Sequence, residues 1–239
     1  MKVNFFVTCL CDTVKANVAK RTVALLEQLG CEVIFPEAQS CCGQPSINSG
    51  YVESSKPAMK SFIRAFECND YPIVTPAGSC AAMVKAYPEY LRYEPEWASR
   101  AQAVADRLFE FTQFVVRELG VVQLGAKLVG TAVYHPSCSL IRKLGVRDEP
   151  LSLLAEVEGL TLLLIDNQET CCGFGGTFSV KMGEISGEMV KEKVRHMSEV
   201  TPDYLIGADI SCLMNIGGRL HREGKAIKVM HIAEVLASR

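Results

Sequence analysis

Thr170-Cys171-Cys172-Gly173-Phe174-Gly175-Gly176 contains two adjacent cysteines followed by a glycine, and Ser40-Cys41-Cys42-Gly43-Gln44-Pro45 contains the same three residues earlier in the chain. A more distant cysteine lies on either side of each pair. Upstream, Cys9 and Cys138 precede the pairs at nearly the same separation, 32 (41 − 9) and 33 (171 − 138). Downstream, Cys80 and Cys212 follow them at separations of 38 (80 − 42) and 40 (212 − 172). Eight of the eleven cysteines thus form two sets of four, which indicates an internal repeat in this 239-residue chain.

The composition is that of a folded protein with a substantial core, since 49% of the residues are hydrophobic and 22% are charged. The net charge is −2, and no basic run with interleaved aromatic residues is present, so we expect no nucleic-acid partner. No apolar run reaches the roughly 18 residues of a transmembrane helix. The N-terminal run at residues 3–11 ends at Asp12 and does not look like a signal peptide. We therefore expect a cytoplasmic protein, and in that reducing compartment cysteines favour metal or redox sites over disulfides.

The first half of the chain alternates short apolar strands with helices. Strands are predicted at residues 3–8, 32–35 and 71–75. One helix has its apolar face between Val18 and Leu29 and is followed by Gly30, a second spans residues 53–68, and a third begins at Cys80. Strands that alternate with helices in this way predict a small parallel sheet with helices on both faces.

The second half repeats this order. Residues 96–119 are predicted to form a mostly helical connector, and the domain boundary is placed between residues 120 and 127. Beyond it, the predicted strands are 128–134, 160–166 and 204–208, and the predicted helices are 181–197 and 231–236. The predicted fold is therefore α/β, with two similar lobes related by the repeat. Each lobe has a small parallel sheet flanked by helices, and the two domains are residues 1–120 and 127–239.

Both sets of cysteines are placed where parallel sheets bind ligands. The outer cysteines come shortly after predicted strands, at the carboxyl edge of the sheet and next to helix N-termini. Free N–H groups there lower thiol pKa values and can donate hydrogen bonds to cluster sulfur atoms. In the adjacent pairs, an extended backbone points successive thiols to opposite sides, so they can reach different atoms of a bulky cluster. Gly43 and Gly173 let the backbone approach inorganic sulfide closely or take a positive φ.

Two other kinds of site compete with an iron–sulfur cluster. Zinc also accepts four cysteines, but structural zinc sites usually have paired ligands two to four residues apart, and none is present. Either adjacent cysteine pair could form a strained, easily reduced disulfide, although no Cys-x-x-Cys motif supports this thiol–disulfide role. The ligand spacing favours iron–sulfur, with Cys9, Cys41, Cys42 and Cys80 at one site and Cys138, Cys171, Cys172 and Cys212 at the other.

The repeated pattern resembles the cysteine-rich CCG domain that occurs in heterodisulfide reductase and in the iron–sulfur subunits of glycolate oxidase and anaerobic glycerol-3-phosphate dehydrogenase. The match is closest to the lactate utilization protein A group of this family and covers nearly the whole chain. The segments that carry it are residues 6–10, 41–45, 48–51, 78–80, 171–182, 205–209 and 212–219.

This resemblance implies an iron–sulfur electron-transfer subunit of a bacterial L-lactate oxidation system. Such a chain would be part of an oxidoreductase rather than a self-sufficient enzyme. Its expected partners are a ferredoxin-like iron–sulfur protein and a small third protein. The alternatives are a thiol–disulfide redox subunit similar to heterodisulfide reductase and a zinc-stabilised structural subunit.

The chain departs from the family pattern at one position in each half. The fullest pattern ends in Cys-x-x-Cys and supplies five thiols to a non-cubane cluster. The additional position is Ala77 in the first half and Asp209 in the second. The four remaining thiols match a cubane [4Fe–4S] cluster, one in each lobe. Asp209 is either a further ligand or an exposed helix cap, whereas Ala77 cannot ligate iron, so the second site is the better supported.

Four further residues attract attention because of their chemistry. Cys11 follows the first predicted ligand by two positions and is interpreted as the start of a helix, with a ligand role as the alternative. Cys31 and Cys68 lie outside the pattern and are expected to be small core residues. His135 lies three residues before Cys138 and is expected to be a hydrogen-bonded structural histidine. Its alternative roles are to tune a cluster or to carry a proton.

Overall fold

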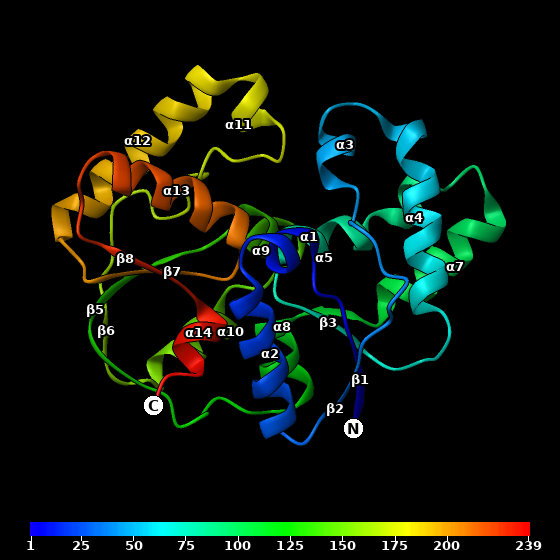
Figure 1. Cartoon of the computed structure of the whole chain (residues 1–239), viewed down its shortest axis with the longest axis horizontal. Helices are drawn as coiled ribbons and strands as arrows, with labels where there is room; N and C mark the ends of the chain where they lie inside the picture. The colour runs from blue at the N-terminus through cyan, green and yellow to red at the C-terminus, as the bar shows by residue number, and fades with distance from the viewer.

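The computed structural model describes residues 1–239 and contains two four-stranded sheets, shown side by side in Figure 1. The strands of the first sheet are β1 (Lys2–Phe5), β2 (Glu32–Ile34), β3 (Ile73–Thr75) and β4 (Leu108–Glu110). Those of the second sheet are β5 (Lys127–His135), β6 (Glu158–Leu162), β7 (Tyr204–Gly207) and β8 (Lys228–His231). Every pairing is parallel, and the strand orders are β2-β1-β3-β4 and β6-β5-β7-β8. The predicted pair of similar α/β lobes is confirmed.

Helices flank both sheets, and none combines the length and apolar character that crossing a bilayer requires. In the first lobe they are α1 (Cys9–Thr13), α2 (Ala16–Gln28), α3 (Gln44–Asn48), α4 (Val52–Phe66), α5 (Gly78–Lys85), α6 (Tyr87–Tyr90), α7 (Pro95–Asp106), α8 (Phe111–Gln113) and the π-helical turn η1 (Phe114–Glu118). In the second lobe they are α9 (Cys138–Lys143), α10 (Asp148–Ala155), α11 (Phe178–Lys181), α12 (Gly183–Val200), α13 (Ile210–Arg222) and α14 (Ile232–Leu236).

Each sheet has a fourth strand that the sequence did not predict. Strand β4 interrupts the predicted helix at residues 96–119 and pairs with β3, with Leu108 opposite Ile73. Strand β8 pairs with β7 and ends at His231, where the terminal helix had been predicted to begin. Both are edge strands of three or four residues, and so short a segment shows no periodicity that separates a strand from a helix.

Two predictions near the ends of elements were wrong, one about the end of a strand and one about the burial of a cysteine. The strand predicted at residues 160–166 is β6, which ends at Leu162, and Leu164 beyond it is 81% exposed. Apolar residues are common on protein surfaces, so an apolar run alone does not define a buried strand. Cys31 is buried as expected, but Cys68 is exposed, because it lies beyond the C-terminal end of α4 rather than on its buried face.

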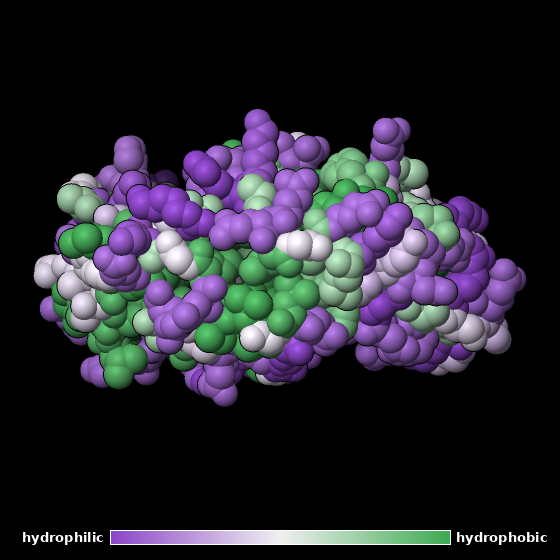
Figure 2. All heavy atoms as spheres, turned by 90° about the horizontal axis from the view of Figure 1, so that it is seen from below, coloured by the Kyte–Doolittle hydropathy of each residue, from purple (hydrophilic) through white to green (hydrophobic).

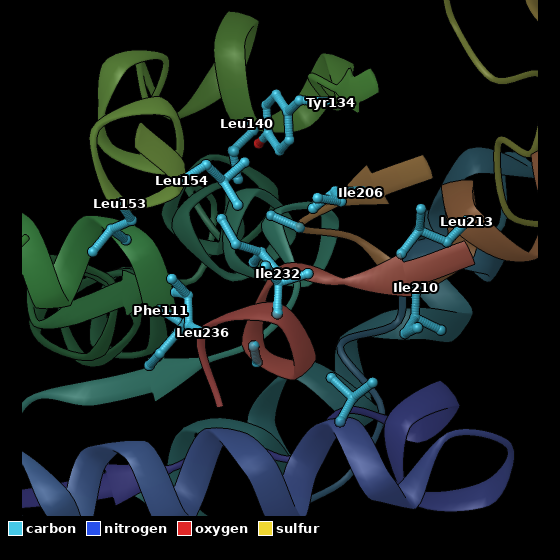
Figure 3. Close-up of a cluster of buried hydrophobic side chains, with 14 of the residues drawn as sticks. Phe111, Tyr134, Leu140, Leu153, Leu154, Ile206, Ile210, Leu213, Ile232 and Leu236 are labelled. Atoms are coloured by element: carbon cyan, nitrogen blue, oxygen red, sulfur yellow. The ribbon is translucent and has the colours of Figure 1, made fainter. Parts of the chain in front are cut away.

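A hydrophobic core crosses from one lobe to the other. One cluster of 39 buried residues contains side chains from both lobes, whereas a second cluster of 19 lies in the first lobe alone. Helix α2 packs against α14, and helix α8 packs against α10. Figure 3 shows Phe111 of α8, Leu153 of α10 and Leu236 of α14 gathered in this shared core. Residues 120–127 connect the two sheets, but because the core is shared their use as a domain boundary stays a prediction.

The face of the molecule that carries both chain termini has an uneven polarity. Seen from that side in Figure 2, hydrophobic residues gather in the middle and on the left, and the right end is mostly hydrophilic. The left of the view is the second lobe, as comparison with Figure 1 shows. The apolar surface therefore belongs to the second lobe and to the zone between the lobes.

Glu110 ends strand β4 and caps helix α8. Its Oε2 accepts hydrogen bonds from the N–H groups of Thr112, at 2.8 Å, and Gln113, at 3.2 Å. The side chain is fully buried, and its Oε1 has no hydrogen-bond partner. Burial raises the pKa of Glu110 to about 7, although the hydrogen bonds at the helix end oppose this rise.

We expect the apoprotein to become less stable relative to a Glu110→Gln variant as the pH rises from 5 to 8. The folded chain holds a proton that the unfolded chain releases above its ordinary pKa of 4.5, so this stabilisation is present below that pH and is lost as the pH passes about 7. The shift corresponds to about 3 kcal/mol. Urea unfolding of both proteins at the two pH values measures the difference. Glu118→Gln, at an exposed site, is the control, and identical pH profiles for Glu110→Gln and wild type would contradict the expectation.

Candidate metal centre

The outer cysteines of each lobe follow the two strands between which the strand order reverses. In the first sheet these are β1, which precedes Cys9, and β3, which precedes Cys80. In the second sheet β5 precedes Cys138 and β7 precedes Cys212. Open parallel sheets bind their ligands at the carboxyl ends of such strands, because the two following helices diverge there and leave a crevice. The duplicated fold thus creates two equivalent sites.

Each outer cysteine lies in the first turn of a helix. Cys9 is the first residue of α1, and Thr8 caps that helix by accepting a hydrogen bond from the N–H of Cys11. Thr8 has a φ of 62°, which is strained for a β-branched residue. Strained backbone of this kind concentrates at functional sites, where the surrounding structure fixes it. At the equivalent place in the second lobe, Ser137 caps the helix that begins at Cys138.

The adjacent cysteines lie in loops that follow β2 and β6, and the glycine after each pair shapes the loop. Gly43 and Gly173 both have a φ of 80°, which was one of the two roles that the sequence offered for them. Only glycine adopts this conformation without strain. At Gly173 a side chain would also have no room, since a Cβ atom would lie 2.9 Å from the carbonyl oxygen of Ser186.

A different side chain anchors each loop. The Tyr87 hydroxyl donates a hydrogen bond of 2.8 Å to the Cys42 carbonyl oxygen. In the second lobe, Asn215 Nδ2 donates a hydrogen bond of 2.7 Å to the Cys172 carbonyl oxygen. The backbone of the inner cysteine is therefore fixed in both lobes, although by residues of different chemistry.

The structure brings the four predicted cysteines of the first lobe together, and we call them the first quartet. The Sγ atoms of Cys9 and Cys41 are 3.7 Å apart. The thiol of Cys42 is within hydrogen-bonding reach of both Cys41 and Cys80. Cys42 and Cys80 are buried, whereas Cys9 is exposed and Cys41 is half-buried. The first quartet therefore has two inner thiols and two that face outward.

The second quartet, formed by Cys138, Cys171, Cys172 and Cys212, has the same arrangement. The thiols of Cys138 and Cys171 are in hydrogen-bonding contact, and Cys172 contacts both Cys171 and Cys212. Cys172 and Cys212 are buried, and the other two thiols are half-buried. One nitrogen of His135 and the sulfur atoms of Cys172 and Cys212 all lie within 4.8 Å of one another. These three residues are far apart in the sequence, but they lie close enough together in the fold to hold a metal ion.

The pKa values of the first quartet reflect hydrogen bonds among its own thiols. Hydrogen bonds with Cys42 and Cys9 lower the pKa of Cys41 far below its ordinary value. The hydrogen bond with Cys41 and burial raise the pKa of Cys9. The pKa of Cys42 is raised by its own hydrogen bonds with Cys41 and Cys80 and by burial. Negative charge thus concentrates on one sulfur of the free protein. A metal centre that binds thiolates would displace the remaining protons.

Cys138 and Cys172 of the second quartet resist ionisation in the free protein. The hydrogen bond with Cys171 and burial raise the pKa of Cys138. The hydrogen bond with Cys171 lowers the pKa of Cys172, but contact with Cys212 and burial outweigh it, so the pKa of Cys172 rises. A bound cation would stabilise the ionised form of four closely spaced, partly buried thiols, because it compensates their negative charge.

The two quartets line neighbouring cavities at the boundary between the lobes. The cavity beside the first quartet has a volume of about 190 Å³, and that beside the second about 140 Å³. Ser79 of the first lobe and Phe174, Asp209 and Ser211 of the second lobe line both cavities. A single layer of side chains therefore separates the two sites.

Asp209 belongs to this shared layer and caps a helix in each lobe. Its Oδ1 accepts a hydrogen bond of 3.1 Å from the N–H of Ser211, in the first turn of α13. Its Oδ2 accepts a hydrogen bond of 2.8 Å from the N–H of Ser79, in the first turn of α5. Ala77, which precedes α5, provides no side-chain cap of its own. The capping interpretation of Asp209 is confirmed, but the residue is only 2% exposed rather than on the surface, and its role as an iron ligand stays a prediction.

The expectation for His135 was wrong. The residue is 1% exposed, and neither ring nitrogen has a hydrogen-bond partner. It is therefore not a hydrogen-bonded structural histidine, and its ring lies beside the second quartet instead. Cys11 is buried inside the short helix α1, as interpreted, and its thiol lines neither cavity. Burial raises the pKa of Cys11 to about 12.

Sequence reasoning missed Lys193, which had no motif around it. The residue is on α12 and only 1% exposed, and the charges of Cys172, Cys212 and Cys171 are near enough to affect its pKa. A signal was present in the repeat itself, because the corresponding region of the first lobe has no buried charged residue. Aligning the two halves position by position would have singled it out.

Comparison with known proteins agrees with this duplicated arrangement. The cysteine-rich domain family CCG matches the chain twice, at residues 3–85 and 132–217. The uncharacterized protein YkgE of Escherichia coli is 66% identical over 239 residues, and lactate utilization protein A of Geobacillus sp. strain WCH70 is 60% identical. Lactate utilization protein A of Geobacillus thermodenitrificans is 59% identical. Each comparison covers all of this chain and all of the relative. The chain therefore belongs to the cysteine-rich CCG-domain family, and its similarity to lactate utilization protein A extends from end to end.

Proposed function

We propose that each quartet binds one [4Fe–4S] cluster and that the chain is an electron-transfer subunit. The observation that carries this proposal is the convergence of four thiols in each lobe, from positions as far apart in the sequence as Cys9 and Cys80 or Cys138 and Cys212. Four cysteine thiolates are the usual ligands of such a cluster, which accepts and releases single electrons. The buried inner thiols would shield it from water, and the outer thiols would leave it near the surface.

The arrangement of the two sites supports a role in moving electrons rather than in binding a large substrate. The two cavities are small, adjoin each other and share lining residues such as Asp209 and Ser211. Centres in these positions would be close to each other and close to the protein surface. A partner protein could then exchange electrons with one site, and that site could exchange them with the other.

We infer that the electrons come from the oxidation of L-lactate. The support is the name of the relatives, lactate utilization protein A, at about 60% identity over the full length. A lactate utilization system of several components is consistent with a chain of this kind, and we propose a ferredoxin-like iron–sulfur protein and a small third protein as its partners. The chain would then be one subunit of an oxidoreductase.

A zinc-stabilised structural subunit is the second candidate, and one observation favours it. His135, Cys172 and Cys212 present a nitrogen and two sulfur atoms within 4.8 Å of one another. Mixed histidine and cysteine sites are common for structural zinc. At the first quartet no histidine takes this place, so the zinc interpretation accounts for only one of the two sites.

Anaerobic purification followed by metal analysis tests the proposal. We expect a brown protein with iron and acid-labile sulfide in equal amounts, about four of each for every occupied quartet. A strain that lacks the chain should lose growth on L-lactate and regain it when wild type is supplied. A colourless protein with stoichiometric zinc and no sulfide would contradict the proposal and support the structural subunit.

A further inference from the structure

The two quartets are alike, but their surroundings differ at two corresponding positions. Phe6 precedes Cys9 by three residues, as His135 precedes Cys138. Phe62 lies between Cys42 and Cys80, at separations of 20 (62 − 42) and 18 (80 − 62). Lys193 lies between Cys172 and Cys212, at separations of 21 (193 − 172) and 19 (212 − 193). The repeat therefore places His135 and Lys193 where the first lobe has two phenylalanines.

Aromatic side chains surround the inner thiols of the first quartet. The rings of Phe6 and Phe62 meet edge to face, with their centroids 4.8 Å apart, and Tyr87 packs against Phe62 at 5.7 Å. These residues belong to the same buried cluster as Cys42 and Cys80. Phe62, at the position that corresponds to Lys193, is fully buried, and the first lobe has no buried lysine or arginine.

The second quartet has a buried cation and an unpartnered imidazole in the same place. The ammonium of Lys193 donates a hydrogen bond to the Gln168 carbonyl oxygen, and no carboxylate pairs with it. An ammonium has three N–H donors, so this contact leaves most of its charge uncompensated. Burial lowers the pKa of Lys193 to about 8, while the nearby thiols, Cys172 first among them, oppose this effect.

A buried charge without a partner is strongly unfavourable, so its position calls for an anion nearby. The candidates are the sulfur atoms of Cys172 and Cys212, which affect the pKa of Lys193. Helix α12, which carries Lys193, contacts the loop of Cys172, since Ser186 Oγ donates a hydrogen bond of 2.8 Å to the Gly173 carbonyl oxygen. His135 adds a hydrogen-bond donor beside the same two sulfur atoms, since a neutral imidazole carries one N–H. The structure thus provides compensation for negative charge at the second site and none at the first.

We propose that Lys193 and His135 make the second site easier to reduce than the first, an inference that rests on both quartets holding iron–sulfur clusters. Reduction adds one negative charge to a cluster. A cation in a medium of low dielectric constant and a hydrogen bond to sulfur both stabilise that charge, whereas an apolar surrounding does not. An electron that can reach both sites therefore resides at the second.

The test is a redox titration of the anaerobically reconstituted full chain, followed by electron paramagnetic resonance. Single-site variants Cys42→Ala and Cys172→Ala assign the signals to the two sites. We expect the second site to have the higher midpoint potential in wild type. Lys193→Met should reduce the equilibrium constant for reduction of the second site at least tenfold, which is about 59 mV for one electron. The midpoint potential of the first site should stay unchanged. His135→Phe should shift the second site in the same direction by less.

Lys191→Met is the matched control, because this exposed lysine lies on the same helix and pairs only with Glu188. It should shift neither potential, and Lys193→Arg should retain the wild-type value. A first site that is the more easily reduced in wild type would overturn the inference, as would unchanged potentials in both Lys193→Met and His135→Phe. If Lys193→Met does not bind iron, His135→Phe decides the matter. Wild type without iron and sulfide would instead refute the proposed function, and this result is obtained before any titration.

Discussion

Replacing Cys172 by Ala is expected to remove the iron of the second site and to leave that of the first, so that about half of the bound iron and sulfide is lost. Cys172 is 3% exposed and contacts both Cys171 and Cys212, which makes it the central thiol of its quartet. Alanine provides no ligand and is small enough to fit the same place. Iron and sulfide per chain, measured after anaerobic reconstitution, give the result, and growth on L-lactate should be lost with the cluster.

Two further variants make this experiment specific. Cys42→Ala should remove the other half of the iron, because Cys42 has the same central place in the first quartet. Cys31→Ala changes a buried cysteine outside both quartets and should keep all the iron. Full iron content in Cys172→Ala would exclude this residue as a ligand. Growth on lactate that persists without the second cluster would show that the electron-carrier role is wrong.

Replacing Asp209 by Ala is expected to lower the free energy of unfolding by about 2–4 kcal/mol, because two helices lose their cap at once and each cap is worth about 1–2 kcal/mol. The N–H groups of half-buried Ser79 and buried Ser211 would lose their acceptor. One of the two hydrogen bonds joins the lobes, so the loss should also weaken their contact. Urea unfolding of the apoprotein measures the effect apart from any metal binding.

Asp203→Ala is the matched control for this variant. Asp203 accepts hydrogen bonds from the N–H and the hydroxyl of Thr131, but it is exposed and acts within one lobe. Its loss should cost about 1 kcal/mol or less. Asp209→Asn should retain part of the stability, since the amide oxygen of asparagine can still accept a hydrogen bond from the N-terminus of one helix. Equal losses for Asp203→Ala and Asp209→Ala would contradict the importance of the shared cap.

The sequence was sufficient for the parts of the site that depend on repetition. Two sets of four cysteines at matching spacing predicted two similar lobes. The glycine after each pair suggested either a close approach to a cluster or a positive φ, and the structure shows the positive φ at Gly43 and Gly173. Strands β4 and β8 escaped prediction because three or four residues at a sheet edge carry no periodic pattern. Their place was fixed by pairing with β3 and β7, which is a long-range effect.

The surroundings of the quartets were harder to predict for a different reason. Lys193 lies on an amphipathic helix, where a lysine is normally expected on the solvent side. Its burial depends on how α12 packs over the loop that contains Gln168, which no local pattern reveals. A helix cap was one of the two roles predicted for Asp209, but the second helix that it caps lies far earlier in the chain, at Ser79. Contacts of this range follow only from the assembled fold.

The reciprocal packing of α2 on α14 and of α8 on α10 has a consequence for the origin of the molecule. In the repeat α2 corresponds to α10 and α8 corresponds to α14, so the two contacts are equivalent, as they are in a symmetric homodimer. This is the packing that a single-lobe ancestor would form with an identical copy, and joining the two copies in one chain would make the pair permanent. The two copies now differ at corresponding positions, with Phe6 and Phe62 in the first lobe and His135 and Lys193 in the second.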